Sequence, residues 1–222
     1  MKYLIFDSSS IITLAMNNFL HILDKLGEEF DGEFCITSHV KNEVVNNPLK
    51  IKRFELEALN ILSLIKRGII EVKESKDLEK EVQKMKISLN SLFVTNNQKL
   101  KLFHDGEVSC FALANQLIKE GHEVLLIIDE RTARMVIENQ ENLRKLLEDK
   151  LHTKVDTRKI NLNFIKGLKV VRSAELGLVA YKQGFIELPA SKDQAIEAIL
   201  YSLKYKGCSI SHIEIEEAKK LF

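Results

Sequence analysis

Two nearly continuous apolar runs constrain the fold of this chain more than any other feature. The runs are KYLIF at 2–6, followed directly by Asp7, and VLLII at 124–128, followed directly by Asp129. A strand without alternation of apolar and polar residues is buried on both faces, which is typical of a parallel sheet covered by helices on both sides. We therefore expect an α/β fold in which these two strands are central.

Other short apolar runs alternate with segments of helical periodicity, as in a parallel sheet with crossover helices. The expected strands are 2–6, 33–36, 69–72, 124–128 and 168–171, and the expected helices are 9–25, 39–46, 54–67, 75–90, 107–120, 131–149 and 173–183. Ser8 or Ser9, Ser38 and Asp105 are the expected N-caps. The predicted architecture is a three-layer sandwich formed by residues 1–188, with residues 189–222 as a helical extension packed on the same domain.

Composition excludes several classes of protein. No apolar run approaches the ~18 residues needed to span a bilayer, so we expect a cytoplasmic protein without a membrane partner. The three cysteines, Cys35, Cys110 and Cys208, lie far apart without a CxxC pair, so neither a zinc knuckle nor a disulfide framework is indicated. The formal net charge of +1 means that any site for a polyanion must be local.

A local excess of basic residues occurs between 144 and 172. It is either an ordinary solvated charged surface or a site for a polyanion, and the sequence leaves both interpretations open.

Three serines follow Asp7, and their hydroxyls are suited to capping the helix that a parallel strand feeds. No GxSxG motif surrounds them, which argues against a serine nucleophile. Asp7 itself lies at the carboxyl end of a predicted central strand, where ligands of parallel sheets bind, although an N-capping role is an alternative. Asp129 repeats this pattern, and two facing carboxylates would repel each other unless a cation such as Mg²⁺ or Mn²⁺ lies between them.

Further acids extend this predicted cluster. Glu43 lies in ITSHVKNEVV, on a short helix that follows a strand, and a solvated surface acid is its alternative interpretation. Asp105 and Glu107 open a helix in FHDGEVSCFALA, where capping and the helix dipole also favour acids. We expect the Glu130 side chain to point away from the cluster.

The order of these motifs resembles PIN-domain nucleases, and in particular a branch of predicted nucleic-acid-binding proteins with a GE-led helix and an IDE-R-AR turn. The segments that show this resemblance are the strand ending at Asp7, the helix with Glu43, DGE at 105–107, LLIIDERTAR, and VVRSAELGLVAYKQGFI at 170–186. The stretch from about 137 to 166 is longer than is usual in that branch.

This resemblance implies an RNA-hydrolysing enzyme with an acidic Mg²⁺ or Mn²⁺ site. Asp7 and Glu43 match the first two catalytic acids, and Glu107 and Asp129 match the third and fourth. Asp7, Glu107 and Asp129 would hold the metal, with Ser8, Ser9 and Asp105 as accessory residues. Candidate RNA-binding residues are Arg131, Arg134, Lys150, Lys154, Arg158 and Lys159. Arg134 is alternatively a partner for one of the acids.

The resemblance also implies that the protein is the toxin of a toxin-antitoxin pair, with an antitoxin partner, and that it forms a homodimer. Two rival classes remain. The first is a non-catalytic PIN-like regulatory or nucleic-acid-binding module. The second is a phosphohydrolase with a nucleophilic Asp7, for which a second acid is expected where this chain has Ser9.

Overall fold

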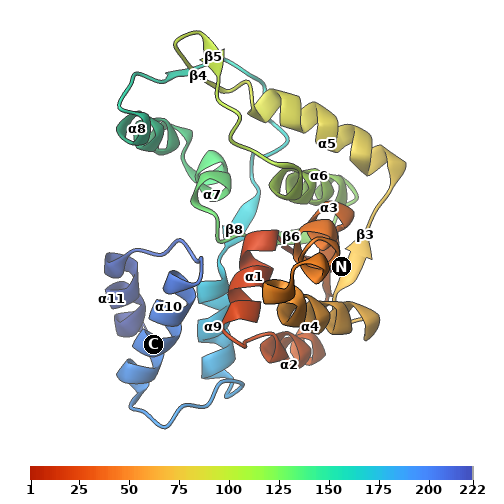
Figure 1. Ribbon diagram of the computed structural model, residues 1–222, viewed down its shortest axis with the longest axis vertical. Helices are drawn as coiled ribbons and strands as arrows, with labels where there is room; N and C mark the ends of the chain where they lie inside the picture. The colour runs from red at the N-terminus through yellow and green to blue at the C-terminus, as the bar shows by residue number, and fades with distance from the viewer. Residues whose placement is uncertain (222) are drawn as a thin grey trace.

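The computed structural model describes residues 1–221 and contains a five-stranded parallel sheet in the order β3-β2-β1-β6-β8 (Figure 1). Its strands are β1 (Lys2–Phe6), β2 (Glu33–Thr37), β3 (Glu71–Lys73), β6 (Glu123–Ile127) and β8 (Lys169–Val171). The two apolar runs pair directly, with Phe6 opposite Ile127. The expected α/β class, the five strands and the central position of the two runs are confirmed.

Helices cover this sheet. They are α1 (Ser8–Met16), α2 (His21–Glu29), α3 (Ser38–Lys41), α4 (Glu55–Lys66), α5 (Lys76–Leu89), α6 (Asp105–Lys119), α7 (Arg131–Glu138), α8 (Gln140–Leu151), α9 (Ser173–Lys182), α10 (Lys192–Tyr205) and α11 (His212–Leu221). α6 packs on β1, β2 and β6, with α5 beside it, while α1 contacts both α4 and α9 (Figure 1). The result is a layered α/β arrangement with one continuous hydrophobic core.

Two expected long helices are each broken in two by asparagine. The predicted helix 9–25 ends at α1, because Asn17 caps it and Asn18 adopts a left-handed φ of 58°, a conformation that asparagine tolerates better than most residues. The predicted helix 131–149 divides at Asn139, whose extended backbone ends α7 and whose side chain accepts the Asn142 N–H that opens α8. Helical periodicity alone did not reveal these caps.

The N-caps lie one or two residues earlier than expected. Asp7 caps α1, Thr37 caps α3 and His104 caps α6, so the expected caps Ser8 or Ser9, Ser38 and Asp105 are wrong. All three caps have the extended backbone that an N-cap requires, and Asp7 and Thr37 adopt it where β1 and β2 end. After α3 the chain continues as a π-helical turn, η1 (Asn42–Asn46), and then two 3₁₀ turns, η2 (Pro48–Lys50) and η3 (Lys52–Phe54).

A second, three-stranded sheet was not expected from the sequence. It has the order β5-β4-β7 and contains β4 (Phe93–Thr95), β5 (Gln98–Lys99) and β7 (Asp156–Thr157). Asn96 and Asn97 both have positive φ, which is the backbone of a tight two-residue hairpin. The small sheet therefore brings the segment after α5 beside the charged stretch after α8.

The C-terminal helices pack on the main body of the chain. α10 contacts α9, and α11 contacts α10, at the end of the molecule opposite β4 and β5 (Figure 1). A Cβ at Gly177 of α9 would lie 3.0 Å from Leu203 and 3.2 Å from Ile199, so glycine allows α9 and α10 to approach closely. Residue 222, the last of the expected extension, lies outside the described residues.

Two negative findings accompany the fold. Within residues 1–221, no helix combines the length and the apolar content needed to cross a bilayer. The three cysteines are buried free thiols, as the absence of a CxxC pair indicated.

Candidate functional site

Asp7 lies at the carboxyl end of β1 and is almost completely buried, with 2% of its surface exposed. Its Oδ2 accepts the Ser9 backbone N–H at 3.1 Å and the Ser9 hydroxyl at 2.6 Å. Burial raises the pKa of Asp7 to about 6, the two Ser9 bonds oppose that rise, and the charge of Glu43 adds to it. Asp7 is therefore both a helix cap and a carboxylate in an unfavourable environment for its charge.

The serines after Asp7 position the neighbouring groups. The Ser9 hydroxyl donates to Asp7 and accepts the backbone N–H groups of Asp129 at 3.1 Å and Glu130 at 3.2 Å. The Ser8 hydroxyl donates to Glu43 Oε2. These serines thus connect three segments that are distant in the sequence.

Glu43 reaches this edge of the sheet from the π-helical turn η1. Its carboxylate packs against Gly106 at the start of α6, where a Cβ would lie 2.4 Å from Glu43 Oε2. Only glycine leaves that space. Glu43 is therefore held between Ser8 and the first turn of α6.

Glu107 lies in that same turn of α6, and its Oε2 accepts the His104 backbone N–H at 2.8 Å in a capping box. Burial raises the pKa of Glu107 to about 7, followed by the charge of Asp7, while the His104 N–H opposes the rise and the charge of Glu130 adds to it. Burial also raises the pKa of the Cys110 thiol, and the charges of Asp7, Glu107 and Glu43 raise it further. The structure thus brings three of the expected acids together.

Asp105 occupies the first position of α6 and forms an ion pair with Lys86 at 2.7 Å. His104, which precedes it, is the cap. The expected cap at Asp105 is thus replaced by a surface ion pair to α5.

Asp129 is placed differently from what the sequence indicated. It is fully buried, its Oδ1 accepts the Ser173 backbone N–H at 2.8 Å, and its Oδ2 accepts the Ser173 hydroxyl at 2.6 Å. Burial raises the pKa of the Cys208 thiol to about 12, and the next largest cause is the charge of Asp129. The Asp129 carboxylate therefore faces the start of α9, which corrects the expectation that it faces Asp7.

Strand register explains this placement. Phe6 pairs with Ile127, and side chains of paired residues lie on the same face of a sheet while successive side chains alternate. Asp7 is one residue after Phe6, whereas Asp129 is two residues after Ile127. Their side chains therefore lie on opposite faces of the sheet. Glu130 is three residues after Ile127, so its side chain lies on the same face as that of Asp7.

Glu130 is the acid that the sequence analysis set aside. Its Oε2 accepts the Ala133 backbone N–H at 2.6 Å, and it lies close enough to Glu107 for its charge to raise the pKa of that group. The expectation that its side chain points away is wrong. Counting the alternation from the pairing of the two apolar runs would have identified it.

The expected RNA-binding residues divide into engaged and free groups. Arg134 lies 3.5 Å from Glu138 and donates to the Ser209 carbonyl at 3.2 Å, so its expected alternative partner among the clustered acids is absent. Lys154 forms an exposed pair with Asp156 at 3.1 Å. Four others have exposed side chains: Arg131, Lys150, Arg158 and Lys159.

A divalent cation fits the chemistry of the acids at the carboxyl edge of the sheet. Among residues 1–221, no three acidic, imidazole or thiol side chains already stand at metal-binding spacing. Mg²⁺, however, is usually held by one or two carboxylates together with waters and substrate phosphate, so a closed cage of protein ligands is not required. The raised pKa values of Asp7 and Glu107 show an electrostatic conflict that such a cation would relieve.

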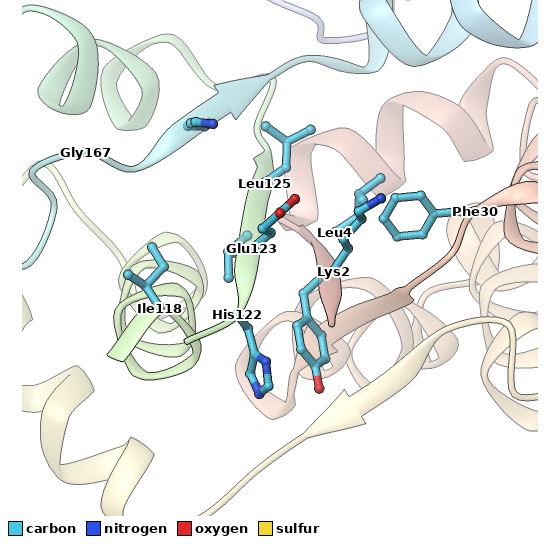
Figure 2. A pocket seen from close by; sticks show the side chains of 11 residues that line it. Lys2, Leu4, Phe30, Ile118, His122, Glu123, Leu125 and Gly167 are labelled. Carbon is cyan, nitrogen blue, oxygen red and sulfur yellow. The ribbon is translucent and has the colours of Figure 1, made fainter. Parts of the chain in front are cut away.

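A hollow of about 430 Å³ lies at the opposite, amino edge of the sheet (Figure 2). Leu4, Leu125 and Phe30 contribute apolar side chains, and Lys2 and Glu123 contribute charged ones (Figure 2). None of the residues expected to act in catalysis lines it. The acids therefore define a separate site at the carboxyl edge.

Comparisons with known proteins do not assign the chain to a family. No family model matches it, and no curated protein matches it. Among solved structures, a chain of the crystal structure of VapBC2 from Rickettsia felis, bound to a DNA fragment from their promoter, is similar with a TM-score of 0.42 and 13% identity, over 78% of this chain and 98% of that chain.

Proposed function

We propose that this protein is a metal-dependent ribonuclease that hydrolyses RNA phosphodiester bonds at the carboxyl edge of its parallel sheet. The observation that carries the proposal is the convergence of Asp7, Glu43, Glu107 and Glu130, from four separate segments, on that edge. The motif resemblance to PIN-domain nucleases agrees with this assignment. Asp129 has a supporting role, because it fixes the start of α9 against the end of β6.

Neighbouring serines position two of these acids, and burial adjusts the pKa of a third. Ser9 orients the Asp7 carboxylate toward the cluster, and Ser8 does the same for Glu43. The raised pKa of Glu107, about 7, allows that group to gain or lose a proton near neutral pH. Neither serine is required as a nucleophile, so no covalent intermediate is part of the proposal.

Asp7, Glu43, Glu107 and Glu130 would hold Mg²⁺ or Mn²⁺. Such an ion, when bound, activates a water for attack on phosphorus and neutralises charge on the phosphate. The Ser8 bond to Glu43 and the His104 bond to Glu107 each use Oε2, so Oε1 of each carboxylate could face the ion while the bond holds the side chain in place.

Cleavage of a fluorescently labelled RNA in Mg²⁺ or Mn²⁺ tests the proposal. Asp7→Asn and Glu130→Gln should each lower kcat by about a hundredfold or more, which is typical for removal of a group that stabilises charge in the reaction. Asp149→Asn removes an exposed acid on α8 and serves as the matched control. Wild-type protein that leaves RNA intact, or Asp7→Asn with unchanged kcat, would refute the assignment.

A second candidate function is an inhibited nuclease held by a partner protein, as in a toxin-antitoxin pair. It is favoured by an apolar hollow of about 460 Å³ between α1, η1 and α4, which has Glu43 at its margin. Its lining includes Ile12, Met16, Val44, Ile51, Phe54 and Ile61, of which several are exposed. An amphipathic helix of an antitoxin would cover these side chains and approach the acids.

Co-expression with the product of the neighbouring gene tests this second function. A stable complex that suppresses RNA cleavage, and that Met16→Glu weakens, would support the antitoxin partner. Recovery of this chain alone with full activity would contradict it.

A further inference from the structure

We infer that a basic groove beside α5 receives the backbone of single-stranded RNA and leads it to the acid cluster. This inference rests on the proposed function, because it names the substrate path of the same site. The groove is a hollow of about 510 Å³, and its lining includes Gln83, Lys86, Asn90, Lys99, Lys101 and His104.

The groove ends at the acid cluster. His104 lines it and is also the N-cap of α6, and its backbone N–H is bonded to Glu107 Oε2 at 2.8 Å. Lys86, which lines the groove from α5, is paired with Asp105 in the first turn of the same helix. A phosphate chain lying in the groove therefore reaches the acids within one helical turn.

The charge of the groove suits phosphate. Lys99 and Lys101 are exposed, and within residues 1–221 neither has a carboxylate within ion-pair distance. No acidic side chain lines the hollow, and the nearby Asp105 is already neutralised by Lys86. Two unpaired ammonium groups on one short segment are suited to neutralising adjacent phosphates.

The segment that carries Lys99 and Lys101 is fixed at both ends by hydrogen bonds. The Asn90 side chain, at the end of α5, donates to the Phe103 carbonyl at 2.8 Å and accepts the Leu102 and Phe103 backbone N–H groups at 2.7 and 2.9 Å. The hairpin of β4 and β5 holds the other end of the segment, beside α5 (Figure 1). Because the segment is fixed at both ends, little ordering is needed when RNA binds.

The size and lining of the groove favour a single strand. Its volume is that of a pocket for a small ligand, whereas double-stranded RNA is recognised across an extended surface of about 16 base pairs. Phe103 is only 2% exposed and is not available for stacking on bases, so the one ring in the lining that a base could reach is the imidazole of the exposed His104. Binding is therefore directed to the backbone and tolerates different sequences.

Binding of labelled RNA, followed by fluorescence anisotropy across a salt series in EDTA, tests the inference without any cleavage step. The probe is a single strand of about 12 nucleotides, within the usual site sizes for such proteins, and a duplex of the same sequence is the comparison. The variant is Lys99→Ala with Lys101→Ala, and the matched control is Lys192→Ala with Lys206→Ala, the first residue of α10 and the residue that follows this helix, at the far end of the molecule.

The groove variant should bind the single strand about tenfold more weakly near physiological salt, with a log–log salt slope shallower by about 1.4, since each lost phosphate contact contributes about 0.7. The control should match wild type. If wild type cleaves RNA and the groove variant has the same salt slope as wild type, the groove alone is overturned. Failure of wild type to bind RNA would overturn both the groove and the proposed function, and preference for the duplex would overturn the single-strand assignment. If the groove variant binds RNA more weakly with a shallower salt slope but wild type does not cleave RNA, the groove is supported and the catalytic function is rejected.

Discussion

Replacement of Asp7 by Asn should make the metal-free protein more stable at alkaline pH. The pKa of Asp7 rises from 3.8 to about 6 on folding, which at 1.36 kcal/mol per pKa unit is a penalty of about 3 kcal/mol once the group is ionised. Asn removes this penalty and keeps an oxygen that can accept the Ser9 N–H, and Asn and Asp are comparable N-caps. After a loss of about 1 kcal/mol for the weakened Ser9 hydroxyl bond, the net gain is about 2 kcal/mol.

The pH dependence of this gain follows from linkage. An acid whose pKa is raised on folding binds more protons in the native state, so wild-type stability should fall as pH rises from about 4 to about 7, the range of Asp7 and Glu107. The penalty is absent below about pH 4, where the group is protonated in both states, so there Asp7→Asn should gain nothing.

Urea unfolding in EDTA at about pH 5 and about pH 8 measures both effects, and the same titrations in Mn²⁺ measure the response to metal. Wild type should gain stability from Mn²⁺ and Asp7→Asn should gain little. If Asp7→Asn is less stable than wild type in EDTA at about pH 8, capping by the carboxylate outweighs the cost of burying its charge, and the electrostatic reasoning is refuted.

Three further predictions concern other parts of the site. Asp129→Asn should lower the free energy of unfolding by about 1–3 kcal/mol in thermal or urea unfolding, because both Ser173 bonds lose a charged acceptor and one of them loses its acceptor oxygen. A stabilised variant would instead place Asp129 in the repelling cluster. Gly106→Ala should lower RNA cleavage by displacing Glu43 while leaving unfolding stability equal or up to about 1 kcal/mol higher, and unchanged cleavage would show that the position of Glu43 is immaterial. Replacement by Ala of four basic side chains at the surface should flatten the salt dependence of RNA binding; they are Lys150, Lys154, Arg158 and Lys159. An unchanged slope would show that they are ordinary solvated surface residues.

The sheet could be predicted because its strands are read from local sequence. The runs at 2–6 and 124–128 are too apolar for an exposed strand, and they lie side by side at the centre of the sheet. Asp7, Glu43 and Glu107 could be identified for a similar reason, since each follows a strand or opens a helix at the same edge. Local sequence was sufficient for these features.

The remaining features depend on pairing between distant segments. The choice between Asp129 and Glu130 depends on the register of β1 against β6, which a single strand does not reveal. The small sheet joins strands of two or three residues from before α6 and after α8, too short to show periodicity. For that reason the groove that contains Lys99 and Lys101 became visible only in the folded chain.

Mn²⁺ binding measured by titration calorimetry in two buffers of different ionisation enthalpy tests the central claim most directly. Near pH 6.5, Asp7 and Glu107 are partly protonated, so binding at the acid cluster should release protons, because metal ligands must be deprotonated. Wild type should bind Mn²⁺ with proton release, Asp129→Asn should retain both properties, and Asp7→Asn or Glu130→Gln should lose most of the affinity. Absence of Mn²⁺ binding, or binding that is abolished by Asp129→Asn but unaffected by Asp7→Asn and Glu130→Gln, would contradict the account.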